Sequence, residues 1–246
     1  MFKSYYIYDS LNNIEFVEYA KSQINIVDNP NEAECIICLG GDGTILDVFQ
    51  NFPNKYIFPI RNYSRCSKHE KIDFKNLQTN YQDIIYCKKN SENKKYIGIS
   101  ELIIRNNNIS KAMRCSLKIN DKIYAENIVG DGIVCCTKLG STGYFKSIAN
   151  TIFTTSGIGI GFINNTQGMT NLVIDRKSII EIEILRGNCQ YAVDHFIDDV
   201  KEGEKIIFQL DWSYGATLVN YKDVFMCSEC RNKRHSAFVN TIYSVV

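Results

Sequence analysis

The sequence predicts an α/β domain followed by an all-β domain. Up to about residue 60, apolar strand-like runs alternate with segments of helical periodicity in the order β-α-β-α-β. This order is typical of a parallel sheet with helices on its faces. After about residue 90 the chain shows many short strand-like runs separated by polar turns, which is an all-β pattern. We therefore expect a Rossmann-like α/β domain over 1–90, a second domain over 91–225, and a tail over 226–246 that returns to the first domain.

The first domain is expected to contain three strands and two helices. The strands are predicted at 5–8, 35–39 and 56–60, and the helices at 14–24 and about 44–51. The run from Cys35 to Leu39 is continuously apolar, as in a strand buried on both faces. The pair Cys35 and Cys38 is therefore predicted to pack in the core, because residues three apart in a strand point to opposite faces.

The second domain is expected to be built almost entirely of strands. The predicted runs are 96–105, 112–119, 122–128, 133–137, 157–163, 178–185, 190–197, 205–210 and 216–221. One helix is predicted to interrupt them, from near Ser141 past Ile148.

The composition excludes several classes of protein. Hydrophobic residues make up 45% of the 246 residues and the net charge is +1, so a sizeable core is expected and no long basic run indicates nucleic acid. No apolar stretch approaches the roughly 18 residues of a membrane span, and the N-terminus lacks a signal-peptide layout. Ten cysteines in such a chain indicate reduced thiols or metal ligands, and we expect a cytoplasmic protein.

The most informative motif is Gly40-Gly41-Asp42-Gly43-Thr44, directly after the predicted strand 35–39. Three glycines let the backbone approach a ligand closely, and N–H groups at a helix start attract phosphate. A carboxylate repels phosphate, so Asp42 is better explained as a base that takes a proton from a hydroxyl, or as a ligand of a metal beside the phosphates. The alternative is a tight turn in which Asp42 is only the N-cap of the helix.

A second loop rich in glycine and hydroxyl groups, 137–144, follows the turn Asp131-Gly132 and the predicted strand 133–137. It offers backbone N–H groups, three hydroxyls and the ring of Tyr144, which suit the base and ribose of a nucleoside. The alternative is an ordinary helix N-cap at Ser141.

Together, the two loops resemble those of the NAD kinases, which pair Gly-Gly-Asp-Gly-Thr in an α/β domain with Asp-Gly…Thr-Pro-Thr-Gly-Ser-Thr-Ala-Tyr in a β-sandwich domain. The first motif is complete here, and the second is present with Gly143 in place of the usual alanine. The family's Asn-Glu pair corresponds to Ser100-Glu101, and a late carboxylate to Asp194. The resemblance covers about residues 1–225 in order and spacing, and implies that the all-β domain is a sandwich.

The resemblance implies phosphate transfer from ATP or polyphosphate to the 2′-hydroxyl of the adenosine ribose of NAD. Asp42 would be the general base, with Mg²⁺ offsetting the phosphate charge and Gly41, Gly43 and Thr44 holding the donor phosphates. The residues implied for the dinucleotide are Ser100, Glu101, Asp131, Thr142, Gly143, Tyr144 and Ser147. A homo-oligomer is expected by analogy with the family.

The chain departs from the family after its third predicted strand. The usual glycine-rich loop is replaced by 59–69, and Ser100 replaces an amide side chain that can read an adenine edge. Arg61 and Arg65 in this stretch are either phosphate contacts or solvated surface charges.

A zinc site is predicted from two pairs of ligands with two-residue gaps, Cys66 with His69 and Cys227 with Cys230. Three cysteines and one histidine are a common set for structural zinc. The alternative is four unrelated residues in a cysteine-rich chain.

Two other functions remain open on the sequence. A lipid or sphingoid-base kinase shares the first glycine loop, although the 137–144 loop speaks against its apolar acceptor. A non-catalytic nucleotide-binding protein of the same fold is favoured by the altered 61–67 stretch, and the intact Asp42 argues against it.

Overall fold

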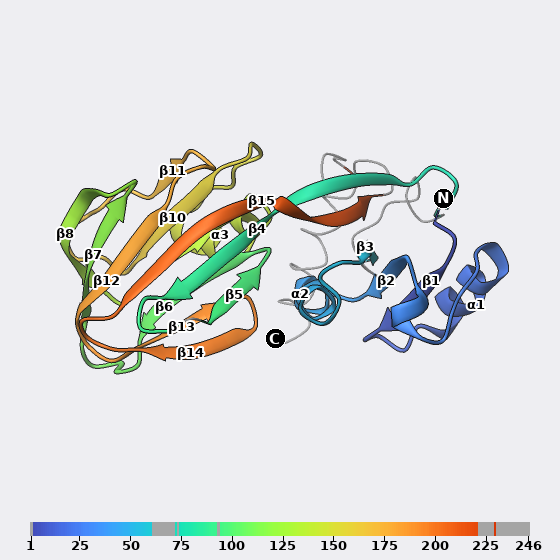
Figure 1. Cartoon of the computed structure of the whole chain (residues 1–246), viewed down its shortest axis with the longest axis horizontal. Helices are drawn as coiled ribbons and strands as arrows, with labels where there is room; N and C mark the ends of the chain where they lie inside the picture. The colour runs from blue at the N-terminus through green and yellow to red at the C-terminus, as the bar shows by residue number, and fades with distance from the viewer. Residues whose placement is uncertain (1, 61–71, 73, 93, 221–228, 230–246) are drawn as a thin grey trace, which may run out of the picture. The chain divides into compact units, whose positions relative to one another are not determined.

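The structure is a computed structural model that describes residues 2–60, 72, 74–92, 94–220 and 229. It divides into two compact units (Figure 1). The first contains Met1–Tyr81 and the chain from Ala216 onward, and the second is Gln82–Gly215. The division falls within two long strands, β4 (Gln78–Lys89) and β15 (Lys205–Asn220), so each contributes residues to both units. The predicted tail, 226–246, lies outside the described residues except for Glu229.

The first unit is the predicted parallel α/β structure. Its sheet has the order β1 (Tyr5–Asp9), β2 (Cys35–Leu39), β3 (Tyr56–Ile60) and the end of β15. All of these pairings are parallel. Helices α1 (Ile14–Gln23) and α2 (Asp42–Asn51) connect the first three strands, and a short 3₁₀ turn, η1 (Pro30–Glu32), precedes β2.

The core of the first unit explains why β2 is continuously apolar. Alternate residues of a strand point to opposite faces. Cys35, Ile37 and Leu39 pack in one cluster with α1 side chains such as Phe16 and Ala20, and α2 contacts β2 and β3. All five residues of β2 are buried, including Cys35 and Cys38, so the prediction that these thiols pack in the core is confirmed.

The second unit consists of two antiparallel sheets. One has the order β11 (Leu172–Ile174), β10 (Ile158–Ile163), β9 (Gly132–Cys136), β6 (Glu101–Asn106), β13 (Cys189–Val193) and β14 (Phe196–Val200). The other contains β15, β12 (Ile180–Arg186), β7 (Met113–Ile119) and β8 (Lys122–Gly130), while β4 pairs with β15 and with β5 (Lys95–Gly98). Buried side chains from both sheets form one cluster, as in a β-sandwich. The predicted fold class is therefore confirmed.

One helix covers the outer face of the six-stranded sheet. Along β9, Ile133 and Cys135 point into the sandwich, whereas Val134 and Cys136 pack against Phe145 of α3 (Tyr144–Ala149). A 3₁₀ turn, η3 (Gly140–Thr142), precedes α3. Strand β9 is thus buried on both faces, and its C-terminal end leads into the second glycine loop.

Several element boundaries differ from the sequence prediction. Helix α2 begins at Asp42 rather than Thr44, and α3 begins at Tyr144 rather than near Ser141 because the separate turn η3 comes first. The predicted runs 96–105 and 190–197 are each two strands, whereas 205–210 and 216–221 belong to the single strand β15. Strands β4 and β11 had no counterpart in the prediction.

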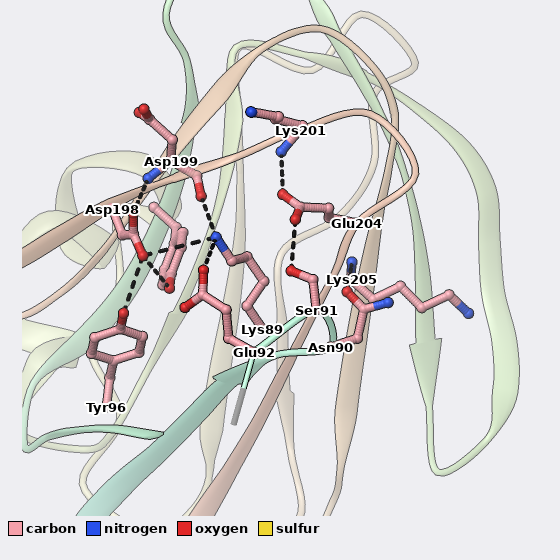
Figure 2. A network of polar contacts seen from close by, with 11 residues as sticks. Lys89, Asn90, Ser91, Glu92, Tyr96, Asp198, Asp199, Lys201, Glu204 and Lys205 are labelled. Atoms are coloured by element: carbon pink, nitrogen blue, oxygen red, sulfur yellow. Dashed lines mark hydrogen bonds and ion pairs between the residues drawn. The ribbon is translucent and has the colours of Figure 1, made fainter. Parts of the chain in front are cut away.

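A polar network joins two hairpins of the second unit (Figure 2). The buried Lys89 Nζ lies 2.6 Å from Glu92 Oε1 and 3.9 Å from Asp198 Oδ2, and donates to the Asp199 carbonyl oxygen at 3.1 Å. Asp198 Oδ2 also accepts from the Tyr96 hydroxyl at 3.1 Å. The network ties β14 to the end of β4 and to β5, so it fixes the hairpin whose turn carries Asp194.

Candidate functional site

The first glycine loop lies at the carboxyl edge of the parallel sheet. Asp9, Leu39 and Ile60, the last residues of β1, β2 and β3, are in register, and Gly40 N donates to the Ile60 carbonyl oxygen at 3.2 Å. In open α/β sheets, ligands bind outside the carboxyl ends of the strands. The fold therefore places Gly40–Thr44 at the edge where such ligands are bound.

The loop presents open backbone and an exposed carboxylate. Gly41 is the N-cap of α2 without a side-chain cap bond, and a Cβ built on Gly41 would have no heavy atom within 4 Å. Asp42 and Gly43 are exposed in the first turn. Asp42 is therefore not the N-cap, and that alternative is wrong. A helix start of this kind offers N–H groups to phosphate, with a carboxylate beside them.

Ser10 lies beside the first glycine loop and was not among the residues predicted for the site. Its hydroxyl donates to the Leu39 carbonyl oxygen at 2.8 Å and lies 3.1 Å from Thr44 Oγ1. The only signal in the sequence is a serine directly after the first predicted strand, at the same edge of the sheet as the glycine loop.

In the second unit, Asp194 holds the turn that carries Ser100 and Glu101. Its carboxylate accepts the backbone N–H groups of Ile99, Ser100 and Glu101 at 2.7, 3.1 and 3.0 Å. Asp194 has a φ of 51°, the left-handed conformation that Asp tolerates better than most residues. The structure thus gives a positioning role to the residue that the sequence only matched to a family carboxylate.

The second glycine loop holds the same turn from the other side. Thr137 Oγ1 donates to the Ile99 carbonyl oxygen at 2.6 Å and accepts from Gly140 N at 3.2 Å, while Thr137 N donates to the Ser100 carbonyl oxygen at 2.9 Å. A Cβ on Gly140 would lie 2.1 Å from that carbonyl oxygen, so only glycine permits the approach. Ser141 is buried and its hydroxyl donates to the Lys138 carbonyl oxygen at 2.7 Å. Because Gly143 is the N-cap of α3, the alternative that Ser141 caps this helix is wrong.

Glu101 is the most perturbed carboxyl group of this turn. Burial, followed by the nearby charge of Asp194, raises its pKa from 4.5 to about 7, while the backbone N–H groups of Tyr144 and Phe145 act in the opposite direction. Its Oε2 atom is buried without a hydrogen-bond partner. Burial also raises the pKa of Asp194, against the effect of its three N–H donors. A buried carboxylate oxygen without a donor is suited to accept a ligand hydroxyl.

The structure brings together most of the residues predicted for the dinucleotide. Gly143 lies close to Glu101, because a Cβ built on Gly143 would be 3.8 Å from Glu101 Oε2. The next residue, Tyr144, is partly buried at the start of α3. Thr142 and Ser147 are exposed, and their hydroxyls donate to the carbonyl oxygens of Leu139 and Tyr144.

Asp131 lies apart from this group. It directly precedes β9, and its carboxylate accepts a hydrogen bond from Asn164 Nδ2 at 2.7 Å. Glu101, on β6, is the register partner of Cys136 at the other end of β9. The two positions are separated by roughly 16 Å along the strand.

The predicted zinc ligands Cys66, His69, Cys227 and Cys230 lie outside the described residues, as do Arg61 and Arg65. Within the residues that the structure describes, no group of three or more His, Cys, Asp or Glu side chains could hold a metal ion. No helix in the same part of the chain is long and apolar enough to cross a membrane.

The chain thus combines a parallel α/β unit that carries a Gly-Gly-Asp-Gly-Thr loop with a β-sandwich that carries a second glycine loop. No family model matches the sequence. An NAD kinase of Clostridium tetani is 26% identical over 227 residues, which cover 80% of this chain and 79% of that protein. An NAD kinase of Clostridium kluyveri is 29% identical over 166 residues, which cover 60% of this chain and 58% of that protein.

Solved structures of NAD kinases share the fold. A yeast NADH kinase complexed with NADH matches with a TM-score of 0.72 at 15% identity, over 91% of this chain and 85% of that one. An NAD kinase from Archaeoglobus fulgidus in complex with ATP matches with a TM-score of 0.71 at 17% identity, over 93% and 98%. The chain is thus similar to NAD kinases in sequence and shares their fold.

Proposed function

We propose that the protein transfers the terminal phosphate of ATP to the 2′-hydroxyl of the adenosine ribose of NAD, giving NADP. The observation that carries this proposal is the placement of Asp42, an exposed carboxylate in the first turn of α2 beside the open backbone of Gly41. The relatives are NAD kinases, and the structural neighbours include one bound to NADH and one bound to ATP.

Asp42 is proposed as the general base. The pKa of an alcohol is far above 7, so the hydroxyl must lose its proton as its oxygen attacks phosphorus. Phosphoryl transfer otherwise depends mainly on positioning and on neutralising charge. The backbone N–H groups of Gly41, Gly43 and Thr44 at the start of α2 would hold the donor phosphates. The hydroxyl oxygen of Thr44 suits the Mg²⁺ that would accompany the donor and offset its charge.

The second unit is proposed to bind NAD. Glu101, with its partnerless Oε2, would accept a ribose hydroxyl, and Tyr144 would pack against the dinucleotide beside Thr142, Gly143 and Ser147. Ser100 would contribute a hydroxyl at the position matched to the Asn of the Asn-Glu pair of NAD kinases. Asp131 remains a predicted dinucleotide residue, although it lies at the opposite end of β9.

Four further features remain predictions: polyphosphate as an alternative donor, a homo-oligomer, a structural zinc ion, and a cytoplasmic location.

The test is incubation with NAD, ATP and Mg²⁺, followed by an assay with an NADP-specific dehydrogenase. Parallel reactions replace ATP by polyphosphate, NAD by NADH, or NAD by a sphingoid base. We expect NADP to form, and Asp42→Asn to lower kcat by roughly 10²–10⁴-fold with little change in NAD affinity. NAD binding without NADP formation would favour a non-catalytic binding protein, and phosphorylation of the lipid alone would favour the lipid kinase.

A further inference from the structure

The Ser10–Thr44 hydroxyl pair lies at the edge of the sheet where the donor phosphates are proposed to bind. Ser10 directly follows β1, and Thr44 lies in the first turn of α2. Their Oγ atoms are 3.1 Å apart, although 34 positions separate them in the chain.

The hydrogen bonds determine which hydroxyl gives its proton to the other. Ser10 Oγ lies 2.8 Å from the Leu39 carbonyl oxygen, which can only accept, so Ser10 donates its single proton there. In the contact with Thr44, Ser10 must therefore accept and Thr44 must donate. The hydroxyl proton of Thr44 is then used in the hydrogen bond to Ser10. Toward a bound ligand, Thr44 Oγ1 can act only as an acceptor, through a lone pair.

The pair is held by the surrounding backbone. A Cβ on Gly40 would lie 2.1 Å from Thr44 Oγ1 and 2.6 Å from Ser10 Oγ, so a side chain at position 40 would displace both hydroxyls. The segment that carries Ser10 is fixed by Asp9, whose carboxylate accepts Leu11 N at 2.8 Å and Asn13 N at 2.7 Å.

We propose that Ser10 is a positioning residue that makes Thr44 a ligand for the hydrated magnesium ion of the phosphate donor rather than a hydrogen-bond donor to its phosphates. Ionised phosphate oxygens only accept hydrogen bonds, so they gain nothing from a hydroxyl whose proton is engaged. A hard cation, or a water molecule bound to it, does bind such a lone pair, and Mg²⁺ takes oxygen ligands. This inference rests on the proposed function.

The residues at this edge of the sheet suit a metal ion whose ligands come partly from the protein and partly from phosphates and water. Mg²⁺ in phosphate-transfer sites usually takes one or two protein oxygens and completes its shell with phosphates and water. The part of the chain that the structure describes holds no cluster of three acidic, His or Cys ligands for a metal. The Thr44 hydroxyl is one such protein oxygen, which leaves the Asp42 carboxylate to act as the proposed general base.

The test uses the full chain with Ser10→Ala and Ser10→Thr. The matched control is Ser22→Ala, another exposed serine of the first unit, whose hydroxyl donates to the Tyr19 carbonyl oxygen. Mn²⁺ replaces Mg²⁺ as the probe, and its electron paramagnetic resonance signal measures free metal in the presence of ATP, with and without protein. The Michaelis constants for Mg-ATP and for NAD are measured on the same variants.

For Ser10→Ala we expect metal affinity in the protein–ATP complex to fall about fivefold, the value of one ordinary hydrogen bond. The KM for Mg-ATP should rise by a similar factor, with the KM for NAD unchanged. Ser10→Thr should restore both, because it keeps the hydroxyl, and Ser22→Ala should change neither.

Thr44→Val serves as a second variant, because it removes the proposed ligand atom itself. Unchanged Mn²⁺ affinity in Ser10→Ala would overturn the role of Ser10, and unchanged affinity in Thr44→Val would overturn the role of Thr44 as a ligand. A wild-type protein that makes no NADP would instead contradict the proposed function, and the Mn²⁺ measurement would still report on Ser10.

Discussion

Replacing Glu101 by Gln is expected to stabilise the ligand-free protein at neutral and alkaline pH while weakening its binding of NAD. Glu101 is held in a buried turn beside Asp194, and its Oε2 atom has no hydrogen-bond partner. The charged form of such a carboxylate is disfavoured. Gln has nearly the same shape and never carries the charge, so the variant avoids this cost.

The magnitude follows from the pKa. A rise from 4.5 to about 7 corresponds to about 3 kcal/mol of unfolding free energy, at about 1.4 kcal/mol per pH unit. Because the folded pKa lies above the unfolded one, the folded protein binds the proton more tightly. Stability contributed by protonated Glu101 is therefore complete below pH 4.5 and is lost as the pH rises to about 7.

The assay is urea unfolding at several pH values from 4.5 to 8, with calorimetric titration of NAD at pH 8. The free energy of unfolding of Glu101→Gln should match that of the wild type near pH 4.5 and exceed it by about 1–3 kcal/mol at pH 8. The lower end of this range applies if relaxation around the site reduces the full value of about 3 kcal/mol. The control is Glu126→Gln, which changes an exposed glutamate on β8. If the free energy of unfolding of the Glu101 variant depended on pH in the same way as that of the wild type, the account of the buried Glu101 charge would be wrong.

Three further changes test other parts of the chain. Tyr144→Ala should raise the Kd for NAD about 5–30-fold by removing aromatic packing, without loss of folding, and unchanged calorimetric binding would refute its role. Lys89→Met should lower the free energy of unfolding by about 1–2 kcal/mol, because it removes the cation that joins Asp198 to the end of β4, whereas the exposed Lys122→Met should not. For the predicted zinc site, metal analysis should give about one zinc per chain and chelation should lower the Tm, and a content well below one contradicts the prediction.

The parts of the fold with local signals were predictable from the sequence. The periodicity and the apolar run of β2 predicted the parallel unit, and polar turns predicted the strands of the sandwich. Strand β4 gave no such signal, because its first four residues are exposed and the strand is defined by pairing with β5 and β15. The break between β13 and β14 was also hidden, since Asp194 is held there by N–H groups more than ninety positions away in the chain.

The glycine loops were predictable as motifs, but the residues that position them were not. Ser10 meets Thr44 only because β1 and β2 are adjacent in the sheet and end in register. The start of α2 was predicted two residues late, because Gly41 caps the helix without a side-chain hydrogen bond and so leaves no polar cap to recognise. Both cases depend on contacts or backbone conformations that no local pattern records.

The departure at Ser100 affects the ligand rather than the turn that carries it. Ser100 is held through its backbone, whose N–H bonds to Asp194 and whose carbonyl oxygen accepts from Thr137. Since none of these bonds uses the side chain, the position can change from an amide to a hydroxyl while Glu101 stays in place. A serine at this position lacks the amide group that could both donate to and accept from an adenine edge. A serine at position 100 is therefore expected to alter base recognition while leaving Glu101, the carboxylate proposed to bind the ribose, in the same geometry.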